Sequence, residues 1–317
     1  MLSLGAPSRW VFVTGMPRGG TSFVGRILSV PLSVDYIHEP FNPDCAMDGL
    51  DQLLPYTRVG LDNEPRLGAA IRELQRYNVR IRTGRYRNDR LGRRIIKPIV
   101  GSRGPFHYRV ARYNPWHRTA IVKDPVGCLL TQYLIETFGF SAVIILRHPI
   151  PVAESFARLR ADANEHLASL RSQRAFVEEY LTDEDERLVR PSYDDPRAAA
   201  AVMWRVLCRA LVKQSEETGV PIIRLEDLSV RPVEGFRQLY ERFGLPWSQR
   251  VERRVLRFTG GTAALPRSRG PVTQFVRDSA NITKASIERA PKAARARVLE
   301  LCDEVAAHWY DPESYLA

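Results

Sequence analysis

Hydrophobic residues in this chain fall into short runs that are separated by stretches with helical spacing. The runs are bounded by turn-forming residues and predict buried strands at Trp10–Thr14, Val34–His38, Ala120–Lys123, Ser141–Leu146 and Pro221–Leu225. Between them, apolar positions three and four residues apart predict helices at Ser22–Ser29, Cys128–Phe138, Val152–Leu159 and Ala198–Thr218. Strands that alternate with helices indicate a parallel sheet covered on both faces, so the pattern predicts an α/β fold.

Two insertions and a helical C-terminal part surround this predicted core. Residues 44–116 contain a predicted helix, Leu67–Arg76, followed by basic, turn-rich segments at Gly84–Arg94 and Gly101–Pro115. Residues 167–196 contain a predicted helix, Ser169–Leu181, and then an acidic stretch. Residues 232–317 predict helices at Val233–Phe243, Gln249–Phe258, Ile282–Ala290 and Lys292–Trp309. We expect residues 1–317 to form a single domain, since this length supports one large core.

The first predicted strand leads into a glycine-rich turn, Thr14–Phe23, that opens a helix. Gly15 and Gly20 have the spacing of a nucleotide-triphosphate P-loop, but Thr21 replaces its lysine. Glycines allow a close backbone approach, and a helix N-terminus offers unpaired N–H groups to an anion. The turn therefore predicts a cradle for phosphate or sulfate. Its candidate binding residues are Arg18, Gly19, Gly20, Thr21 and Ser22.

A second strand, turn and helix start begins at Arg147. Pro149 fits the first turn of the following helix, where a missing N–H costs little, and Ser155 comes eight residues after Arg147. A cation at this strand end suits a second phosphate and not a metal. We therefore predict that Arg147 and Ser155 bind one phosphate.

Together these motifs resemble those of sulfotransferases that use 3′-phosphoadenosine 5′-phosphosulfate (PAPS). Pro17–Ser22 is similar to the 5′-phosphosulfate loop of that family, and Arg147-His148-Pro149 with Ser155 is similar to its 3′-phosphate motif. Arginine in the first loop is closest in style to the carbohydrate, tyrosylprotein and bacterial members. The resemblance implies a P-loop-like fold, PAPS as co-substrate, no metal, and a hydroxyl-bearing acceptor such as a glycan, glycolipid or metabolite. The insertions would then determine acceptor specificity.

Weaker matches to the same family suggest further candidate residues. Lys123 resembles a lysine that touches the transferring sulfate, although it could instead pair with Asp124. Glu39, in a Glu-Pro segment, is the candidate general base, with His38 as the second choice. Arg277 follows a Gly/Pro-rich stretch where the family has a loop that closes over the nucleotide, and it could reach a phosphate.

Composition narrows the possible partners. The net charge is +11, but no helix-turn-helix, zinc-finger or RNA-binding signature accompanies it, so we expect no nucleic-acid partner. The basic surface is expected to attract an anionic cofactor, and it is also compatible with an anionic acceptor or a membrane. There is no ~20-residue apolar run and no visible signal peptide. The four widely spaced cysteines lack zinc spacing and indicate free thiols, so a cytoplasmic protein is expected.

Two other functions are compatible with the sequence. A nucleotide or small-molecule kinase with a degenerate P-loop would turn over ATP and need Mg²⁺. A non-enzymatic polyanion-binding module would show steeply salt-dependent binding to DNA or RNA.

Overall fold

A parallel five-stranded sheet forms the centre of the protein in the computed structural model, which describes residues 6–44, 47–82, 103–260 and 281–311. The strands are β1 (Arg9–Gly15), β2 (Val34–His38), β3 (Thr119–Lys123), β4 (Ser141–Leu146) and β5 (Ile222–Arg224). Their order is β2-β3-β1-β4-β5, and every neighbouring pair is parallel. The predicted fold class is confirmed, and each predicted strand agrees with the structure to within one residue at either end.

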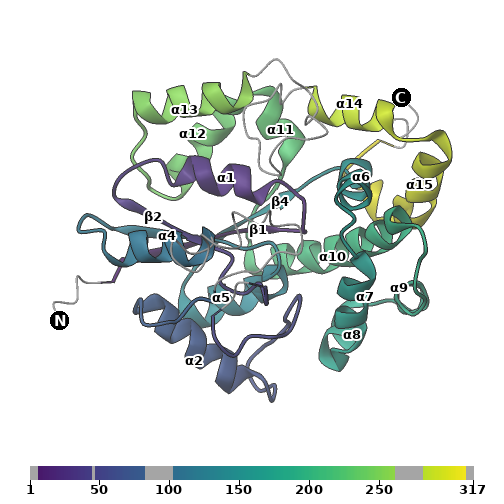
Figure 1. Cartoon of the computed structure of the whole chain (residues 1–317), viewed down its shortest axis with the longest axis horizontal. Coiled ribbons are helices and arrows are strands. Elements are labelled where there is room, and N and C mark those ends of the chain that lie inside the picture. Colours follow the sequence, from purple (N-terminus) through teal and green to yellow (C-terminus); the bar gives the residue numbers. More distant parts are fainter. Residues whose placement is uncertain (1–5, 45–46, 83–102, 261–280, 312–317) are drawn as a thin grey trace, which may run out of the picture.

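Helices cover both faces of the sheet (Figure 1). On one face lie α1 (Thr21–Leu28), α12 (Pro232–Arg242) and α13 (Gln249–Thr259). On the other lie α5 (Thr131–Phe138), α6 (Pro149–Leu159) and α10 (Pro196–Thr218). Successive residues of β1 point to opposite faces of the sheet. Val11 and Val13 pack in the core beneath α1, α12 and α13, whereas Trp10 and Phe12 pack in the core beneath α5, α6 and α10. A strand that is buried on both faces appears in the sequence as a continuous apolar run, which is why β1 could be predicted.

The first insertion contains α2 (Glu64–Gln75) and α4 (Arg103–Arg112). Helix α4 packs along β2 at the edge of the sheet (Figure 1), so the prediction of a turn-rich segment at Gly101–Pro115 was wrong for most of its length. Pro105 lies in the first turn of α4, where an N–H would be unpaired in any case. Tyr108 and Ala111 are buried, and this packing outweighs the weak helical preference of the segment.

The second insertion is also more helical than predicted. The expected single helix at Ser169–Leu181 is two helices, α7 (Ala163–Arg171) and α8 (Arg174–Tyr180). Gln173 separates them, because its side chain accepts a hydrogen bond from Tyr56 N (2.8 Å) and donates one to Leu54 O (2.9 Å). The acidic stretch forms α9 (Asp183–Val189), which begins with a capping box at Thr182.

The C-terminal part adds α14 (Ile282–Arg289) and α15 (Lys292–Ala306), close to their predicted bounds. Two short elements were not predicted separately: a 3₁₀ turn at Cys128–Leu130 and α11 (Leu225–Val230). Leu225 therefore begins a helix and does not end strand β5. Within the described ranges, no helix is both long enough and apolar enough to cross a bilayer.

Candidate active site

The glycine-rich turn connects the carboxyl end of β1 to α1 and depends on two glycines. Gly15 has φ +143°, and a Cβ there would lie 2.1 Å from the carbonyl oxygen of Ile145 in β4. Gly20 has φ +95°, and a Cβ there would lie 2.6 Å from the side chain of Leu225. Neither conformation nor spacing admits another residue without strain. The turn is therefore held tightly between β4 and α11.

Helix α1 begins at Thr21 with open donors. Gly20 is the N-cap residue and supplies no side-chain acceptor, and the first turn contains no acidic residue. In the described part of the chain, the N–H groups of Thr21 and Ser22 meet no hydrogen-bond acceptor. These donors lie at the positive end of the helix dipole, so the turn is suited to an oxyanion.

The two predicted anion motifs meet although 129 residues separate Arg147 from Arg18. Arg18 Nε donates a hydrogen bond to Ser155 Oγ at 2.9 Å, and Arg147 Nη1 donates to the carbonyl oxygen of Arg18 at 3.2 Å. Arg18 itself adopts a left-handed conformation with φ +69°. Two guanidinium groups and a hydroxyl thus converge where β1 and β4 end side by side.

Arg147 is held in place from behind and retains capacity for a ligand. Trp204 Nε1 donates to the carbonyl oxygen of Arg147 at 2.8 Å. Burial lowers the pKa of the guanidinium, which still remains charged. Its Nε is buried and has no hydrogen-bond partner among the described residues. A desolvated cation with an unused donor favours binding of an anion.

Glu226, to which the sequence analysis assigned no role, supports this region. Its carboxylate accepts hydrogen bonds from His148 N (3.0 Å), Thr283 Oγ1 (3.2 Å) and the Tyr310 hydroxyl (3.2 Å). His148 is buried, caps α6 through Nδ1, and burial lowers its pKa to about 3. The Glu226 carboxylate therefore holds the turn that follows Arg147. In the sequence, the only sign of this role is that Glu226 comes directly after the end of β5.

Glu39 and Lys123 form an ion pair at the adjacent ends of β2 and β3, in which the Lys123 side chain is fully buried and the Glu39 side chain is 15% exposed. The Lys123 ammonium contacts Glu39 Oε1, and the Glu39 N–H donates to the Lys123 carbonyl oxygen at 2.8 Å. Asn42 Nδ2 donates to the other carboxylate oxygen at 2.8 Å. Helix α1 approaches Lys123 closely through Gly25, where a Cβ would lie 3.0 Å from Lys123 Cγ. The pair therefore lies against the helix that begins in the glycine-rich turn.

The ion pair sets the protonation of both groups. Burial alone would raise the pKa of Glu39, but the Lys123 charge holds it at about 2. Burial opposes the charge on Lys123, yet the Glu39 carboxylate keeps its pKa above the ordinary value. Asp124, the alternative partner of Lys123, accepts instead from Phe41 N (2.6 Å), Val126 N and Gly127 N. Both members of the pair are thus ionised at neutral pH.

His38 lies beside this pair in a basic, aromatic environment. Its Nδ1 is 3.1 Å from the Tyr36 hydroxyl, and its Nε2 is 3.9 Å from Glu39 Oε1. Burial lowers the pKa of His38 to about 3, so its imidazole is neutral. Arg26 and His107 complete the environment: Arg26 stacks over Tyr36 and contacts His107 Nε2 at 3.0 Å. The sequence analysis assigned no role to Tyr36, Arg26 or His107. Of these, only His107 lies on α4, the helix that was not expected.

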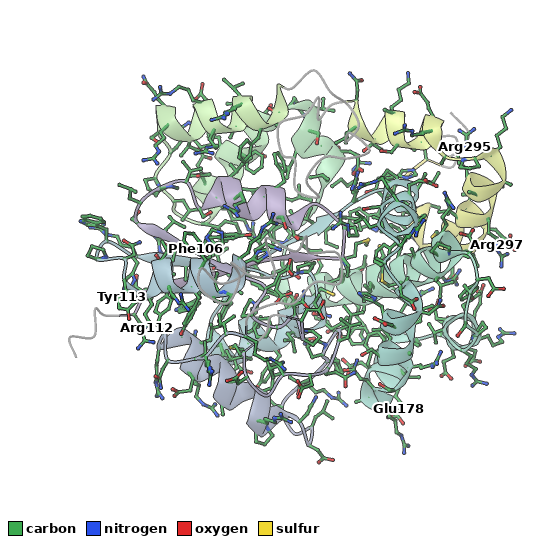
Figure 2. The ribbon with its side chains drawn as sticks, viewed as in Figure 1. Phe106, Arg112, Tyr113, Glu178, Arg295 and Arg297 are labelled. Atoms are coloured by element: carbon green, nitrogen blue, oxygen red, sulfur yellow. The ribbon has the colours of Figure 1, made fainter. Side chains whose placement is uncertain are left out.

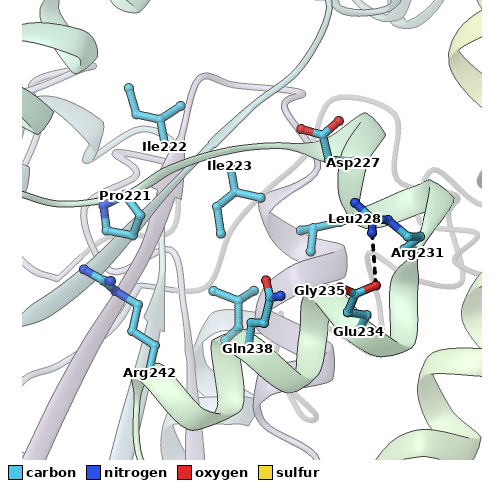
Figure 3. A pocket seen from close by; sticks show the side chains of 11 residues that line it. Pro221, Ile222, Ile223, Asp227, Leu228, Arg231, Glu234, Gly235, Gln238 and Arg242 are labelled. Atoms are coloured by element: carbon cyan, nitrogen blue, oxygen red, sulfur yellow. Dashed lines mark hydrogen bonds and ion pairs between the residues drawn. The ribbon is translucent and has the colours of Figure 1, made fainter.

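The remaining predicted site residue, Arg277, lies outside the described residues. Within the described ranges, no group of three or more His, Cys, Asp or Glu side chains is arranged to hold a metal ion. A separate hollow of about 430 Å³ lies between β5 and α12 (Figure 3). Its rim carries the Arg231–Glu234 ion pair (3.4 Å), and none of the predicted site residues line it.

Neither a scan against protein-family models nor a search of curated proteins finds a match for this chain. Among solved structures, it is similar to the sulfotransferase domain of a Synechococcus olefin synthase (15% identity, TM-score 0.47, covering 97% of this chain and 96% of that one). It is also similar to mouse sulfotransferase SULT7A1 complexed with PAP (11% identity, TM-score 0.42, covering 98% of this chain and 89% of that one). A third similar structure is a sulfotransferase from Alicyclobacillus acidocaldarius (14% identity, TM-score 0.38, covering 97% of this chain and 98% of that one). All three are sulfotransferases, the family that the sequence motifs of this chain resemble.

Proposed function

We propose that this protein is a sulfotransferase that moves the sulfuryl group of PAPS to an acceptor hydroxyl and releases 3′,5′-ADP. The observation that carries the proposal is the contact between the two anion motifs, through Arg18, Ser155 and Arg147. A nucleotide with phosphate groups at both its 5′ and its 3′ positions needs two anion sites within one ligand's reach. The unused Arg147 Nε and the open N–H groups of α1 fit such a ligand.

We assign the 5′-phosphosulfate to Arg18 and the backbone of residues 19–22, and the 3′-phosphate to Arg147 and Ser155. Because Arg18 already contacts Ser155, one guanidinium stands between the two proposed phosphate positions. Arg277 remains a proposed phosphate ligand. The acceptor is a hydroxyl compound, and a glycan, glycolipid or metabolite remains our proposal for its class.

The proposed reaction is an in-line displacement at sulfur. The acceptor oxygen forms a bond to sulfur while the bond between sulfur and the bridging phosphate oxygen breaks, and the acceptor proton passes to a base. The protein mainly aligns the groups and neutralises charge on the non-bridging and leaving oxygens, as in phosphoryl transfer. We assign this neutralisation to Arg18 and Lys123, and the base to Glu39.

The ion pair suggests how the base would become competent. A carboxylate with a pKa of about 2 is a weak base at neutral pH. If Lys123 turns to a sulfuryl oxygen, Glu39 loses the charge that lowers its pKa, while its burial remains. Binding of PAPS would then raise the basicity of Glu39 at the moment when a proton must be accepted.

Nucleotide binding without a metal is the direct test of the proposal. We expect 3′,5′-ADP to bind with micromolar affinity in calorimetry, and EDTA to leave that affinity unchanged. No binding at ~1 mM 3′,5′-ADP would contradict the proposal, because a Kd of that size corresponds to a binding free energy of only about 4 kcal/mol. ATP turnover that requires Mg²⁺ would favour a kinase. Tight, salt-dependent nucleic-acid binding with no response to 3′,5′-ADP would favour a polyanion-binding module.

Replacing Arg147 tests the assignment of the 3′-phosphate. Arg147→Ala is expected to weaken 3′,5′-ADP binding by roughly 1.5–3 kcal/mol, since charge-assisted hydrogen bonds are lost, and to weaken 5′-AMP binding much less. Parallel titrations of both nucleotides measure the difference. The exposed Arg187 provides a control, because Arg187→Ala removes the same charge from α9. Equal weakening of both nucleotides by Arg147→Ala would place the arginine away from the 3′-phosphate.

A further inference from the structure

The outer face of α4 exposes a stripe of apolar side chains. Phe106, Val110 and Tyr113 follow one another at helical spacing, and their exposed fractions are 48%, 56% and 62%. Figure 2 shows Phe106 and Tyr113 beside the ribbon of α4. A helix normally turns such a stripe toward a core, so this one lacks an apolar partner within the described residues.

Two further apolar side chains extend the stripe beyond the end of α4. Trp116 is 66% exposed and Leu32, in the turn before β2, is 65% exposed. The side-chain amide of Asn114 donates to the carbonyl oxygen of Leu32 at 2.9 Å, so this turn lies against the segment that follows α4. We call these five apolar residues, together with Arg109, Arg112 and Arg118, the α4 surface.

The charge of the α4 surface has one sign. Residues 103–118 contain four arginines and no aspartate or glutamate. Arg109, Arg112 and Arg118 are exposed, and the Arg112 guanidinium lies 6.0 Å from the centre of the Tyr113 ring (Figure 2). The acidic Asp35 beneath this surface is buried and bound to Tyr77 and Asn114, so it does not offset the arginines at the surface.

A hollow of about 670 Å³ adjoins the α4 surface. Leu32 and Trp116 contribute apolar walls, while Arg118 and Arg250 contribute cations. Among the residues that the structure describes, no acidic side chain lines it. A concave site with apolar walls and two arginines suits an anionic headgroup attached to an apolar chain.

We propose that the α4 surface docks onto anionic lipid bilayers. Arginines beside exposed aromatic and aliphatic side chains match the interface of such a bilayer, where aromatic rings lie at the headgroup level and cations meet lipid phosphate. A second copy of the chain would present the same positive charge and be repelled. The proposal is independent of the proposed catalytic function, since it needs neither nucleotide nor acceptor.

Docking at this surface would bring the bilayer near the candidate active site. The inner side of α4 carries His107, whose ring packs edge-on against Tyr36 with centroids 5.0 Å apart. Tyr36 contacts His38, the neighbour of Glu39. Only the thickness of one helix, about 10 Å, therefore separates the docked surface from the end of β2.

Vesicle sedimentation of the full chain tests this proposal. We expect the protein to sediment with vesicles that contain about a third phosphatidylserine in phosphatidylcholine, and to stay in solution with pure phosphatidylcholine. Phe106→Ser with Tyr113→Ser is expected to lower partitioning about tenfold, because apolar insertion is lost. Arg109→Gln with Arg112→Gln is expected to lower it about 25-fold, or roughly fivefold for each cation removed.

Matched controls separate docking from general charge and hydrophobicity. Val59→Ser with Val230→Ser removes apolar side chains that are 73% and 66% exposed elsewhere. Arg187→Gln with Arg289→Gln removes the same charge from α9 and α14. We expect both pairs to partition like the unmodified protein. The proposal is wrong if the unmodified protein does not sediment with anionic vesicles, or if the control pairs weaken vesicle binding as much as the α4 variants do. It is also wrong if the α4 variants keep their vesicle binding and lose RNA binding instead.

Discussion

Replacing Glu39 by glutamine is expected to lower turnover about 10²-fold or more and to leave the affinity for 3′,5′-ADP nearly unchanged. Glutamine preserves the size of the side chain and can still accept a hydrogen bond from Lys123 and Asn42. It cannot take up the acceptor proton. The nucleotide is assigned to Arg18, Arg147 and their neighbours, not to Glu39, so binding should persist. Single-turnover kinetics with any active acceptor, found by screening acceptor pools with radiolabelled PAPS, measures the change.

The pH dependence distinguishes a base from a structural carboxylate. In the free protein the pKa of Glu39 is about 2, so protonation of Glu39 would cause no decrease in rate near neutral pH. In the PAPS complex, movement of Lys123 toward the sulfuryl group would raise that pKa. As the pH is lowered, the single-turnover rate should therefore begin to fall at a pH well above the pKa of Glu39 in the free protein. Glu39→Gln should abolish this decrease in rate. Near-normal turnover of the variant would move the base elsewhere, with His38→Gln as the next test, and loss of nucleotide binding would make Glu39 structural.

The sheet could be predicted from the sequence because parallel strands buried on both faces are short apolar runs between turn residues. β2 and β4 agree with their predicted bounds for this reason. The same logic placed Arg18, Lys123 and Arg147 at the carboxyl ends of strands, and the register of β1 with β3 and β4 bears that out. Local patterns thus predicted both the layers of the fold and the edge of the sheet at which these three side chains lie.

Features that depend on contacts between distant segments could not be predicted in the same way. The Glu39–Lys123 pair exists because β2 lies next to β3, and the sequence does not state strand order. Arg18 reaches Ser155 only because β1 lies next to β4. Helix α4 was missed since Gly104, Pro105 and several arginines resemble a turn, while burial of Tyr108 and Ala111 against the sheet edge stabilises a helix there. His107, which lies on this helix, was therefore expected in a loop.

Replacing Lys123 by methionine is expected to lower the free energy of unfolding by about 3–5 kcal/mol and turnover by about 10²–10³-fold. Methionine fills most of the buried space, so the loss reports on charge and not on a cavity. The variant leaves the Glu39 carboxylate buried beside no cation, and it removes the charge that we assign to the leaving oxygens. Urea unfolding and single-turnover kinetics measure the two effects. Lys284→Met is the matched control, since the Lys284 side chain is 72% exposed and its pair with Glu288 is worth little.

The sign of the pH dependence makes this expectation specific to the ion pair. In the unmodified protein, the pKa of Glu39 lies below its ordinary value of 4.5, so its ionisation stabilises the fold above that pH and the benefit is lost as pH falls toward 2. In Lys123→Met, burial acts without the opposing charge and raises that pKa, so the variant loses stability as pH rises. The stability difference between the two proteins should therefore be larger at about pH 7 than at about pH 4. Adding Glu39→Gln to Lys123→Met should restore much of the stability, because no charge is then left buried, but it should not restore turnover. A difference that does not change with pH, or a double variant no more stable than Lys123→Met, would show that Lys123 supports the fold through packing alone.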